Sequence, residues 1–452
     1  MRYPKHPRPR VIRVLISIFL LGLNLPAQAG RLTDTADAVD SVTINGKSQQ
    51  DPFDVYVGTE FIYRSESGTI GREPINGILA NDPCSASSPG KCDFRDELSF
   101  HRSEMLMEFQ AQLGLFRDLA LTLDLPIIIN RSLSFGYSPG ISAQQSSIDP
   151  QDTGNPAQTL FAQNYATDFG GVGQMKLGLR YAPLNDERVK TDPSWLLFFK
   201  WAMPYTSSVY RPMADKEKAS KPVGTGVHFL TFGTAFSKRV AELGMIGIDP
   251  NIQRRGYLDP YLLVSYTRPV PDRSLAEQAL LYKPSNTFGT TPSHKAQIMG
   301  GLEIVLHEDL AQNQLYSVDC GFKADFHSEG RNYSLLTAPL NELTFTEQFF
   351  EFGGVFHALA QPNNLVRVEL DFSLGTRSPY FLTNENVGED TNGDNKVRRE
   401  DNDLLNPYYC GNEGNDLCAQ NSAQHSYDQI GFRFRSQDYF FWSLGLNISL
   451  ML

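Results

Sequence analysis

The C-terminal stretch reads Trp442-Ser443-Leu444-Gly445-Leu446-Asn447-Ile448-Ser449-Leu450 and ends at Leu452, so that large apolar residues alternate with small or polar ones. Successive side chains of a β-strand point to opposite faces, and this period therefore predicts a strand with one apolar and one polar face. The same parity continues back through Phe440 to Phe434, Phe432 and Ile430. We therefore predict one unbroken strand from about residue 428 to residue 452.

The same alternation recurs toward the N-terminus. The clearest case sets Val366, Val368 and Leu370 against Arg367 and Glu369. With the C-terminal strand, the pattern predicts twelve strands, at 53–64, 103–116, 119–130, 171–182, 194–204, 226–239, 256–268, 295–306, 314–327, 345–359, 365–376 and 428–452. Connections between them alternate between short and long, and no run of 18 apolar residues could form a membrane-spanning helix.

These features predict an all-β fold, a transmembrane antiparallel up-and-down β-barrel of about 12 strands, with short periplasmic turns and long extracellular loops. Aromatic residues near the predicted strand ends fit the two membrane interfaces, namely Tyr181, Trp195, Trp201, Tyr205 and Trp442. The alternative is a soluble, exported all-β protein. It would leave rows of large apolar side chains facing water, which soluble proteins avoid.

The N-terminus predicts export. Five basic residues, Arg2 to Arg13, precede an apolar run from Val14 to Leu25, and Ala27-Gln28-Ala29 follows. This arrangement is typical of a signal peptide covering 1–29, followed by a linker or plug at 30–52 and a barrel at 53–452. Removal of the five basic residues changes the formal charge from −11 to −16, which argues against a nucleic-acid partner. We expect an outer-membrane location, with membrane lipids and a small solute as partners.

The five cysteines lie in a chain expected to reach an oxidising compartment. Cys84 and Cys92 are eight residues apart, as are Cys410 and Cys418, and each spacing suits a local disulfide in a loop expected outside the cell. Crossed pairings remain open, because sequence alone does not fix connectivity. Cys320 lies in an alternating run and is expected to serve as a small apolar side chain.

Residues 115–240 carry an order of features that resembles a known family. The segments are Gly170 to Tyr181, then Trp195 to Pro204, then Gly224-Thr225-Gly226 leading into a strand that ends at Ser237-Lys238-Arg239. Their order resembles that of outer-membrane barrels described as transporter or phenol-degradation meta-pathway-like proteins. The resemblance implies a barrel with a role in the passage of hydrophobic or aromatic small molecules.

The parity opposite to the lipid face is polar and carries charges of both signs. The residues expected in the lumen are Glu108, Asp124, Lys176, Arg180, Lys200, Asp319, Lys323, Asp325, Glu351, Arg367, Glu369, Asp371, Arg433 and Arg435. Two interpretations remain open. The charges either line a water-filled conduit that selects solutes or pair across strands and close a narrow lumen.

One loop carries a cation-binding pattern. Residues 390–401 have oxygen-bearing side chains at the first, third and fifth positions, Asp390, Asn392 and Asp394, a backbone carbonyl at Lys396 and a carboxylate at Asp401. This order resembles the calcium loops of dockerin and EF-hand modules, and it predicts a structural Ca²⁺ in the long extracellular loop 377–427. A solvated acidic turn is the alternative.

Catalytic patterns are weak. His425-Ser426 is the nearest approach to the Ser and His pair of an outer-membrane lipid hydrolase, but adjacent residues of a strand point to opposite faces. We therefore expect a non-enzymatic channel or transporter for small solutes, with a non-conducting structural or adhesive barrel as the alternative and a lipid hydrolase as a remote third.

Overall fold

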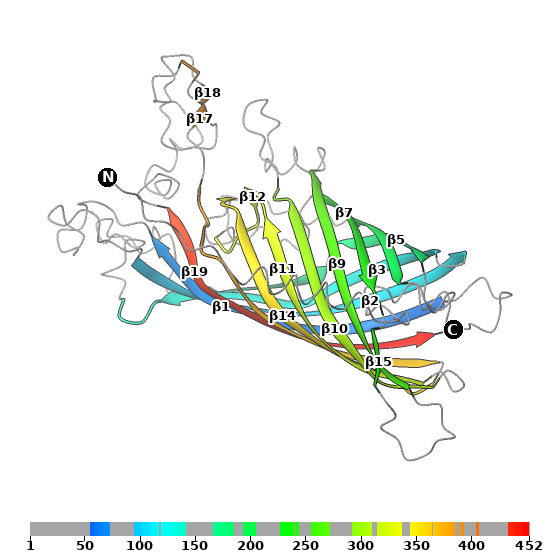
Figure 1. The fold of residues 1–452 in the computed structure, drawn as a ribbon. Coiled ribbons are helices and arrows are strands. Elements are labelled where there is room, and N and C mark those ends of the chain that lie inside the picture. The colour runs from blue at the N-terminus through cyan, green and yellow to red at the C-terminus, as the bar shows by residue number, and fades with distance from the viewer. Residues whose placement is uncertain are drawn as a thin grey trace, which may run out of the picture.

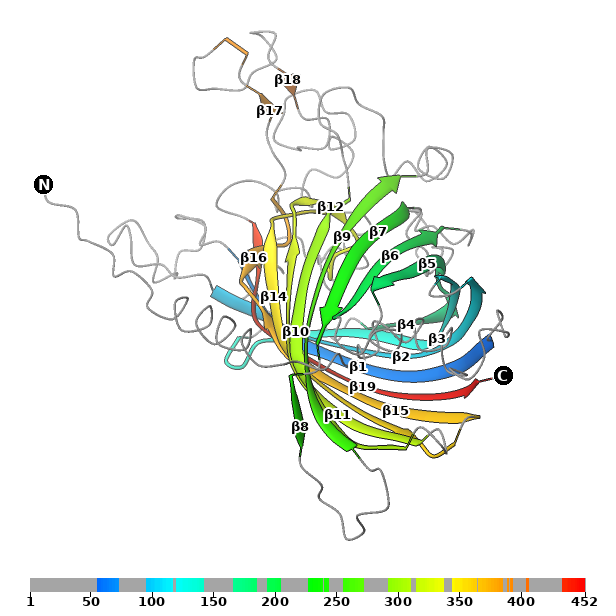
Figure 2. The same ribbon diagram turned by 45° about the vertical axis from the view of Figure 1, so that its right-hand side comes forward.

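The computed structural model describes residues 55–72, 95–116, 119–141, 166–184, 193–204, 227–238, 240–243, 255–271, 292–309, 314–336, 344–363, 365–384, 388–389, 391–392, 404–405 and 433–451. Twelve strands pair with their neighbours in an antiparallel ring, which closes because the first strand pairs with the last. The ring consists of β1 (Val55–Arg72), β2 (Arg95–Phe116), β3 (Leu119–Tyr137), β5 (Met175–Leu184), β6 (Ser194–Met203), β7 (Val227–Ser237), β9 (Arg255–Pro271), β10 (Lys295–Asp309), β11 (Gln314–His327), β14 (Phe349–Gln361), β15 (Val366–Arg377) and β19 (Phe434–Met451). Figures 1 and 2 show the tilted strands of this barrel.

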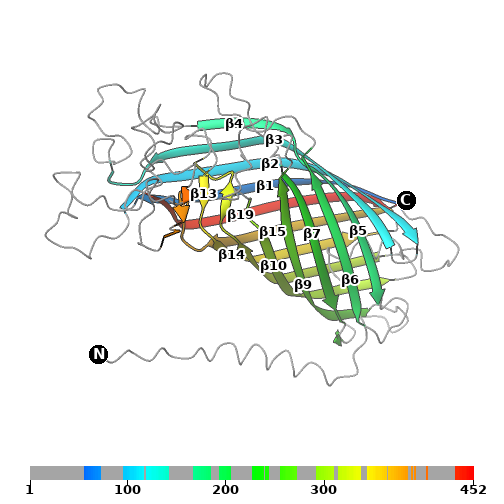
Figure 3. The same cartoon turned by 90° about the horizontal axis from the view of Figure 1, so that it is seen from above.

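Seven shorter strands extend or flank the ring. They are β4 (Ala166–Val172), β8 (Ala241–Leu243), β12 (Gly330–Asn332), β13 (Thr344–Thr346), β16 (Tyr380–Phe381), β17 (Gly388–Glu389) and β18 (Leu404–Leu405). β4 pairs with β3, β8 with β9 and β16 with β19, while β12–β13 and β17–β18 form two separate ribbons. From above, β4 continues the wall made by β1 to β3, whereas β5 to β7 turn away from it (Figure 3).

The predicted barrel of twelve strands is confirmed, and the strand boundaries agree closely except in the first three and the last. β1 runs on to Arg72, β2 begins at Arg95 and β3 runs on to Tyr137, so segments predicted as loop are paired strand. We call the end where β1 begins and β19 ends the proximal end, and the opposite end the distal end. The long strands β1, β2, β3 and β19 build a tall distal wall.

The proximal half has an apolar outer face. On β19, Leu444, Leu446, Ile448 and Leu450 are each 40–48% exposed, although all are large and apolar. Similar residues point outward all around the ring, for example Phe61, Phe109, Leu179, Phe232, Val264, Phe322, Phe356 and Leu370. A closed sheet leaves no unpaired backbone edge, and an apolar outer band is what a bilayer requires.

Aromatic pairs lie at both borders of this apolar band. Toward the proximal end Trp195 stacks on Phe236, with ring centroids 5.7 Å apart. Toward the distal end the Trp201 Nε1 donates a 3.1 Å hydrogen bond to His228 Nδ1, and Tyr63 packs on Trp442 at 5.3 Å. Amphipathic rings are favoured where hydrocarbon meets head groups, so the two sets mark the membrane interfaces.

In the distal wall the two faces are exchanged. The outer face of β2 and β3 carries Ser103 and Ser132, whose hydroxyl oxygens lie 2.9 Å apart, and Ser134, which donates to the His101 carbonyl. The inner face carries Leu98, Phe100, Leu133 and Phe135, all at most 8% exposed. This part of the wall therefore has the polar exterior and apolar interior of a water-soluble protein.

On β3 and β19 a bulge produces the exchange. On β3 the partners of Met105 and Leu106 are Asn130 and Ile128, so one extra residue, Ile129, reverses the parity of everything that follows. On β19 the partners of Ser67 and Thr69 are Phe440 and Gln437, which places an extra residue beside Asp438. Asp438 has φ 48°, a left-handed conformation that Asp tolerates better than most residues. The predicted unbroken parity from Phe440 to Phe434 is therefore wrong, and Phe434 is fully buried inside.

Several predicted features lie outside the described residues. These are the signal peptide, the linker 30–52, the four cysteines Cys84, Cys92, Cys410 and Cys418, His425, and all of the calcium loop except Thr391 and Asn392. The β17–β18 ribbon brackets that loop, because Glu389 pairs with Leu404. Cys320 is a free, exposed side chain on the outer face of β11, where a small apolar group faces lipid.

Candidate functional site: the inner face of the barrel

The membrane-embedded half encloses a polar cavity of about 200 Å³. Its lining comes from strands on several sides of the ring, namely Tyr56, Glu60, Glu108, Gln110, Gln112, Asp124, Arg180, Lys200, Glu369, Asp371 and Asn447. These side chains face inward because the opposite parity of each strand carries the lipid-facing residues. The cavity therefore holds charge and hydrogen-bonding groups at the level of the apolar outer band.

Ion pairs anchor much of the cavity wall. Lys176 Nζ lies 2.8 Å from Glu108 Oε2, and Lys200 Nζ lies 3.4 Å from Asp124 Oδ2. Arg367 is paired with Glu369, and both are about 95% buried. Charges removed from water need such partners, because an uncompensated ion in a low dielectric is strongly destabilising. The pairing fixes the lining side chains in place.

Beside the cavity, an apolar cluster covers part of the inner face of β5 to β10. Leu196, Ala235 and Leu263 pack there with Tyr261, whose hydroxyl donates a 2.8 Å hydrogen bond to Asp319 Oδ2. Gly301 and Gly321 make room for this ring, since a Cβ at either position would lie within 2.6 Å of the tyrosine hydroxyl. This side of the lumen is filled by side chains.

A belt of charged side chains runs around the inner wall on the distal side of the cavity. It begins at Arg131, which pairs with Glu104, and continues through Arg102 to Glu66 at 3.4 Å. The Tyr439 hydroxyl donates to Glu66 Oε2 at 2.6 Å. Arg377 lies over the Tyr439 ring at 4.0 Å and reaches Glu351 at 2.8 Å.

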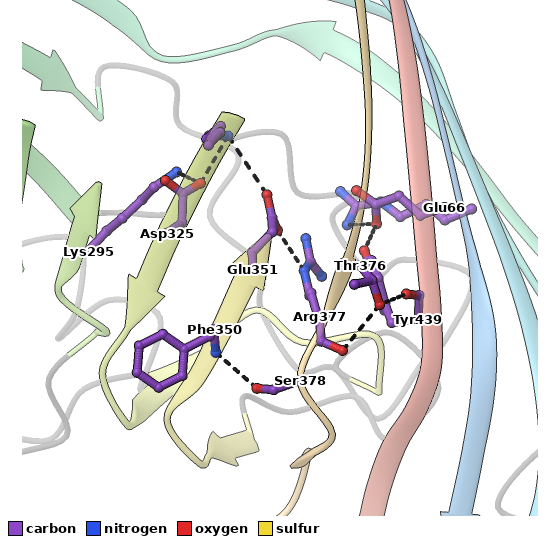
Figure 4. A network of polar contacts seen from close by, with 11 residues as sticks. Glu66, Lys295, Asp325, Phe350, Glu351, Thr376, Arg377, Ser378 and Tyr439 are labelled. Carbon is purple, nitrogen blue, oxygen red and sulfur yellow. Dashed lines mark hydrogen bonds and ion pairs between the residues drawn. The ribbon is translucent and has the colours of Figure 1, made fainter. Parts of the chain in front are cut away.

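The belt then continues onto β11 and β10. Lys323 lies 3.8 Å from Glu351, and both Lys323 and Lys295 lie 2.9 Å from the fully buried Asp325 (Figure 4). Consecutive contacts thus connect eight strands of the ring, from β3 through β1, β19 and β15 to β10. We call these residues the charged belt: Arg131, Glu104, Arg102, Glu66, Tyr439, Arg377, Glu351, Lys323, Asp325 and Lys295.

An apolar cluster lies beyond the belt at the distal end. It joins the inner face of β1 to β3 with Leu335 and Leu336, from the segment between β12 and β13, and with Tyr380, Leu382 and Phe434. Leu336, Leu382 and Phe434 are fully buried. Beside this cluster, β13 and the residue after it are joined to residues 381–384 by backbone hydrogen bonds from Glu347 to Phe381 and from Asn384 to Phe345. We call this group the distal cluster, and it packs across the barrel mouth.

Comparisons with known proteins found similarity only among solved structures. No family model and no curated protein matches the chain. Among solved structures it is similar to the COG4313 outer membrane channel from Pseudomonas putida F1, at 11% identity over 90% of this chain and 98% of that chain, with a TM-score of 0.37.

Two further structures have similar overall coverage. One is a Pseudomonas aeruginosa FadL homologue, at 8% identity over 94% of this chain and 96% of that chain, with a TM-score of 0.33. The other is the outer membrane protease OmpT from Escherichia coli, at 7% identity over 88% of this chain and 96% of that chain, with a TM-score of 0.26. Similarity at this level carries no argument about what this chain binds or does, so its own inner face must supply the argument.

Twelve of the fourteen predicted lumen residues face the lumen, in four groups. Glu108, Asp124, Arg180, Lys200, Glu369 and Asp371 line the cavity, and Lys176 and Arg367 pair with members of that lining. Lys323, Asp325 and Glu351 belong to the charged belt, and Asp319 is held by Tyr261.

Arg433 and Arg435 lie elsewhere. The bulge at Asp438 turns Phe434 inward, so its two neighbours point to the opposite face. There Arg433 lies 3.8 Å over the Phe381 ring and donates to Asn384, and Arg435 lies 5.9 Å from the same ring. The prediction that these two residues face the lumen is corrected accordingly.

Seven of the ten residues of the charged belt were missed from sequence. Six of them lie in the parts of strands that extend past the predicted boundaries or near their limits, namely Glu66, Arg102, Glu104, Arg131, Lys295 and Arg377. The seventh, Tyr439, lies beside the bulge at Asp438. A signal was present: Leu98 and Phe100 alternate with Ser99 and His101, which is strand periodicity with a polar outer face. The apolar residues of this pattern have the parity opposite to those of the lipid-facing segments, so a pattern of outward apolar residues alone does not include them.

Proposed function

We propose that the chain is a channel for small solutes in the outer membrane of a Gram-negative-type bacterium. The observation that carries this proposal is the polar cavity inside a closed barrel, at the level of the lipid-facing band. A barrel that served only as an anchor would have no need to keep five carboxylates and two basic groups around an open space in the membrane. Within such a space water and polar solutes are accommodated without crossing hydrocarbon.

Passage through this channel requires the distal cluster to move. Leu335 and Leu336 lie between two paired segments rather than within the barrel wall, so they can leave the mouth without breaking the ring of strands. The belt beneath them keeps its charges paired while the cluster is closed. We therefore assign Leu335 and Leu336 the role of the gate.

The test is conductance of the purified protein in planar bilayers, with liposome swelling as a second measure of solute flux. We expect brief openings in the wild type and more frequent or longer openings in the Leu335→Ser/Leu336→Ser double variant, because serine no longer stabilises the closed mouth. Leu365→Ser, at an exposed turn position, is the matched control and should behave as the wild type does. Absence of current and flux in both the wild type and the double variant would contradict a channel.

The second candidate is a non-conducting barrel with a structural or adhesive role. The distal cluster favours it, because several of its side chains are fully buried and close the mouth by packing. The same conductance test separates the two functions. The remaining candidate, a lipid hydrolase, rests on His425, which lies outside the described residues.

The lining of the cavity bears on the class of solute that the channel would carry. The family resemblance implied hydrophobic or aromatic solutes, whereas the cavity lining favours solutes with polar or charged groups.

We also propose a Ca²⁺ held by Asp390, Asn392, Asp394, Lys396 and Asp401, and local disulfides Cys84–Cys92 and Cys410–Cys418, in loops on the cell exterior. The β17–β18 ribbon supports the calcium proposal, because it brings the two ends of the loop together.

A further inference from the structure

The charged belt and its neighbour Arg64 carry more positive than negative charge. The Arg64 guanidinium lies 4.0 Å from Glu104 Oε1 and so adds a further cation to the group. The basic members are then Arg64, Arg102, Arg131, Arg377, Lys295 and Lys323, and the acidic members are Glu66, Glu104, Glu351 and Asp325. Six cations against four carboxylates give this group an excess of two positive charges.

The excess arises where one carboxylate is shared by several cations. In the register of the strands, Glu104 on β2 lies opposite Arg64 on β1 and opposite Arg131 on β3. Arg102 also lies 3.7 Å from Glu104 and has Glu66 as a second partner at 3.4 Å. Glu104 is therefore the shared partner of both Arg64 and Arg131, and a single carboxylate balances only one of these two charges.

The basic side chains of this group are also the more exposed ones. They are 20–45% exposed, and Arg64 is the most exposed of them. The four acidic side chains are only 0–12% exposed. Arginine and lysine bury their long stems and keep the charged end in water, whereas the shorter carboxylates stay near the wall. A solute at this level of the lumen therefore meets cations first.

Arg64 faces the lumen and not the membrane. Phe61 and Tyr63 on β1 point outward and are 47% and 37% exposed, so the next residue, Arg64, has the inward parity. Its partner across the strand pair is Ser443, whose hydroxyl oxygen lies 2.7 Å from that of Ser373 on the inner face. The exposed part of the Arg64 guanidinium is therefore exposed to the interior of the barrel.

The chemistry of these groups suits an oxyanion. A guanidinium presents parallel N–H donors that match two oxygens of a carboxylate or a phosphate. Arg64 and Arg102 both lie within 4.0 Å of Glu104, and their side chains are 45% and 31% exposed, so an anion approaching from the lumen can contact both. The polar cavity differs, because its lining and their paired residues include five acidic and four basic side chains.

We propose that the lumenal surface of the charged belt is a binding site for small oxyanions, with Arg64 and Arg102 as its contact groups. This proposal rests on the proposed channel function, for which it names the solute class, namely small molecules with a carboxylate or phosphate group. Binding weakens as the salt concentration rises, because the contact groups are partly exposed and are screened by ions.

The first experiment measures the binding of inorganic phosphate to the purified full-length protein in nonionic detergent micelles. Calorimetry at low ionic strength gives the affinity, and tetramethylammonium is the ligand control of opposite charge. Arg64→Gln should lower the phosphate affinity by about threefold, the effect of one partly exposed charge contact. Arg64→Glu should lower it further, whereas Arg64→Lys keeps the charge and should retain most of the affinity.

Arg268→Gln is the matched control variant. Arg268 is an exposed arginine on β9, and its parity is that of the outward-facing Val264 and Tyr266. Its replacement removes the same charge from the outer face and should leave phosphate binding unchanged. Folding of each variant is checked by its heat-modifiable migration on gels. Unchanged phosphate affinity in a folded Arg64→Gln protein, or an equal loss in Arg268→Gln, would overturn the proposal.

Conductance separates this proposal from the channel function. In bilayers with a gradient of potassium chloride, the reversal potential measures whether chloride or potassium passes more readily. Arg64→Gln should shift it toward potassium, and Arg64→Lys should not. Arg64-dependent phosphate binding without any current would support the anion site and contradict the channel. Current without Arg64-dependent binding would support the channel and contradict the anion site.

Discussion

The proximal and distal halves of the barrel differ in which face of the sheet is apolar, although the same strands run through both. On β2, Phe109 and Met105 point outward in the proximal half, while the inward Glu108 belongs to the cavity wall. Eight residues earlier along the same strand, His101 points outward and Phe100 is buried inside. The solvent outside each half explains the difference, because hydrocarbon surrounds one and water the other.

One strand can therefore pass from hydrocarbon to water if its apolar side chains move from the outer face to the inner face along its length. β1 and β2 change face by changing residue types at constant parity, from Phe61 and Tyr63 to Ser65 and Ser67 on the outside. β3 and β19 change parity through a bulge. The charged belt lies where the two patterns meet, between the polar cavity and the distal cluster.

The largest expected effect concerns the distal cluster. Phe434→Ala should destabilise the folded distal wall by about 3–5 kcal/mol, the range for removing a fully buried phenylalanine side chain. The measurement is chemical denaturation in micelles, read by proteolysis of distal segments. The outward-facing Phe440→Ala, at a position 47% exposed on the same strand, is the control and should cost clearly less. Equal costs would show that the distal interior is not packed as described.

The next effect tests the outer faces directly. Phe109→Arg should lower the free energy of unfolding of the vesicle-inserted protein by about 2–4 kcal/mol, because it places a charge against hydrocarbon. His101→Arg, on the same strand and the same outer face, should cost at most about 1 kcal/mol. Urea titration of vesicle-inserted protein measures both. A large loss of stability in His101→Arg would indicate that the bilayer also covers the distal half, and the two halves would then not differ in their surroundings.

The smallest effect concerns the loop beyond the distal wall. At 1 mM Ca²⁺, a site with a dissociation constant of about 10⁻⁴ M would stabilise the loop by about 1.4 kcal/mol. Protease cleavage within 377–427 should therefore slow roughly tenfold with calcium relative to chelator, and Asp390→Ala/Asp394→Ala should abolish the protection. No protection in the wild type would identify residues 390–401 as a solvated acidic turn.

Local alternation along the chain was sufficient to predict the barrel. Alternation in segments such as 366–374 and 442–450 has one physical solution, because a row of large apolar side chains on every strand must meet hydrocarbon. It also indicated the parity of the cavity residues from Glu108 to Asp371, since an inward position follows once the outward face is known. These are local properties, and each can be deduced from one strand alone.

The tertiary structure decided what depends on pairs of strands. The bulges at Ile129 and Asp438 follow from register with neighbouring strands, which no single strand specifies, and they place Phe434 inside and Arg433 and Arg435 outside. The charged belt depends on eight strands closing in one order, so that Glu66 meets Arg102 and Tyr439 from positions up to 373 residues apart. Likewise, Gly445 is only a small residue in the sequence. In the closed barrel it is where the Glu60 carboxylate packs closely against the backbone of β19 beside Asp371, because ring closure brings β1, β15 and β19 together.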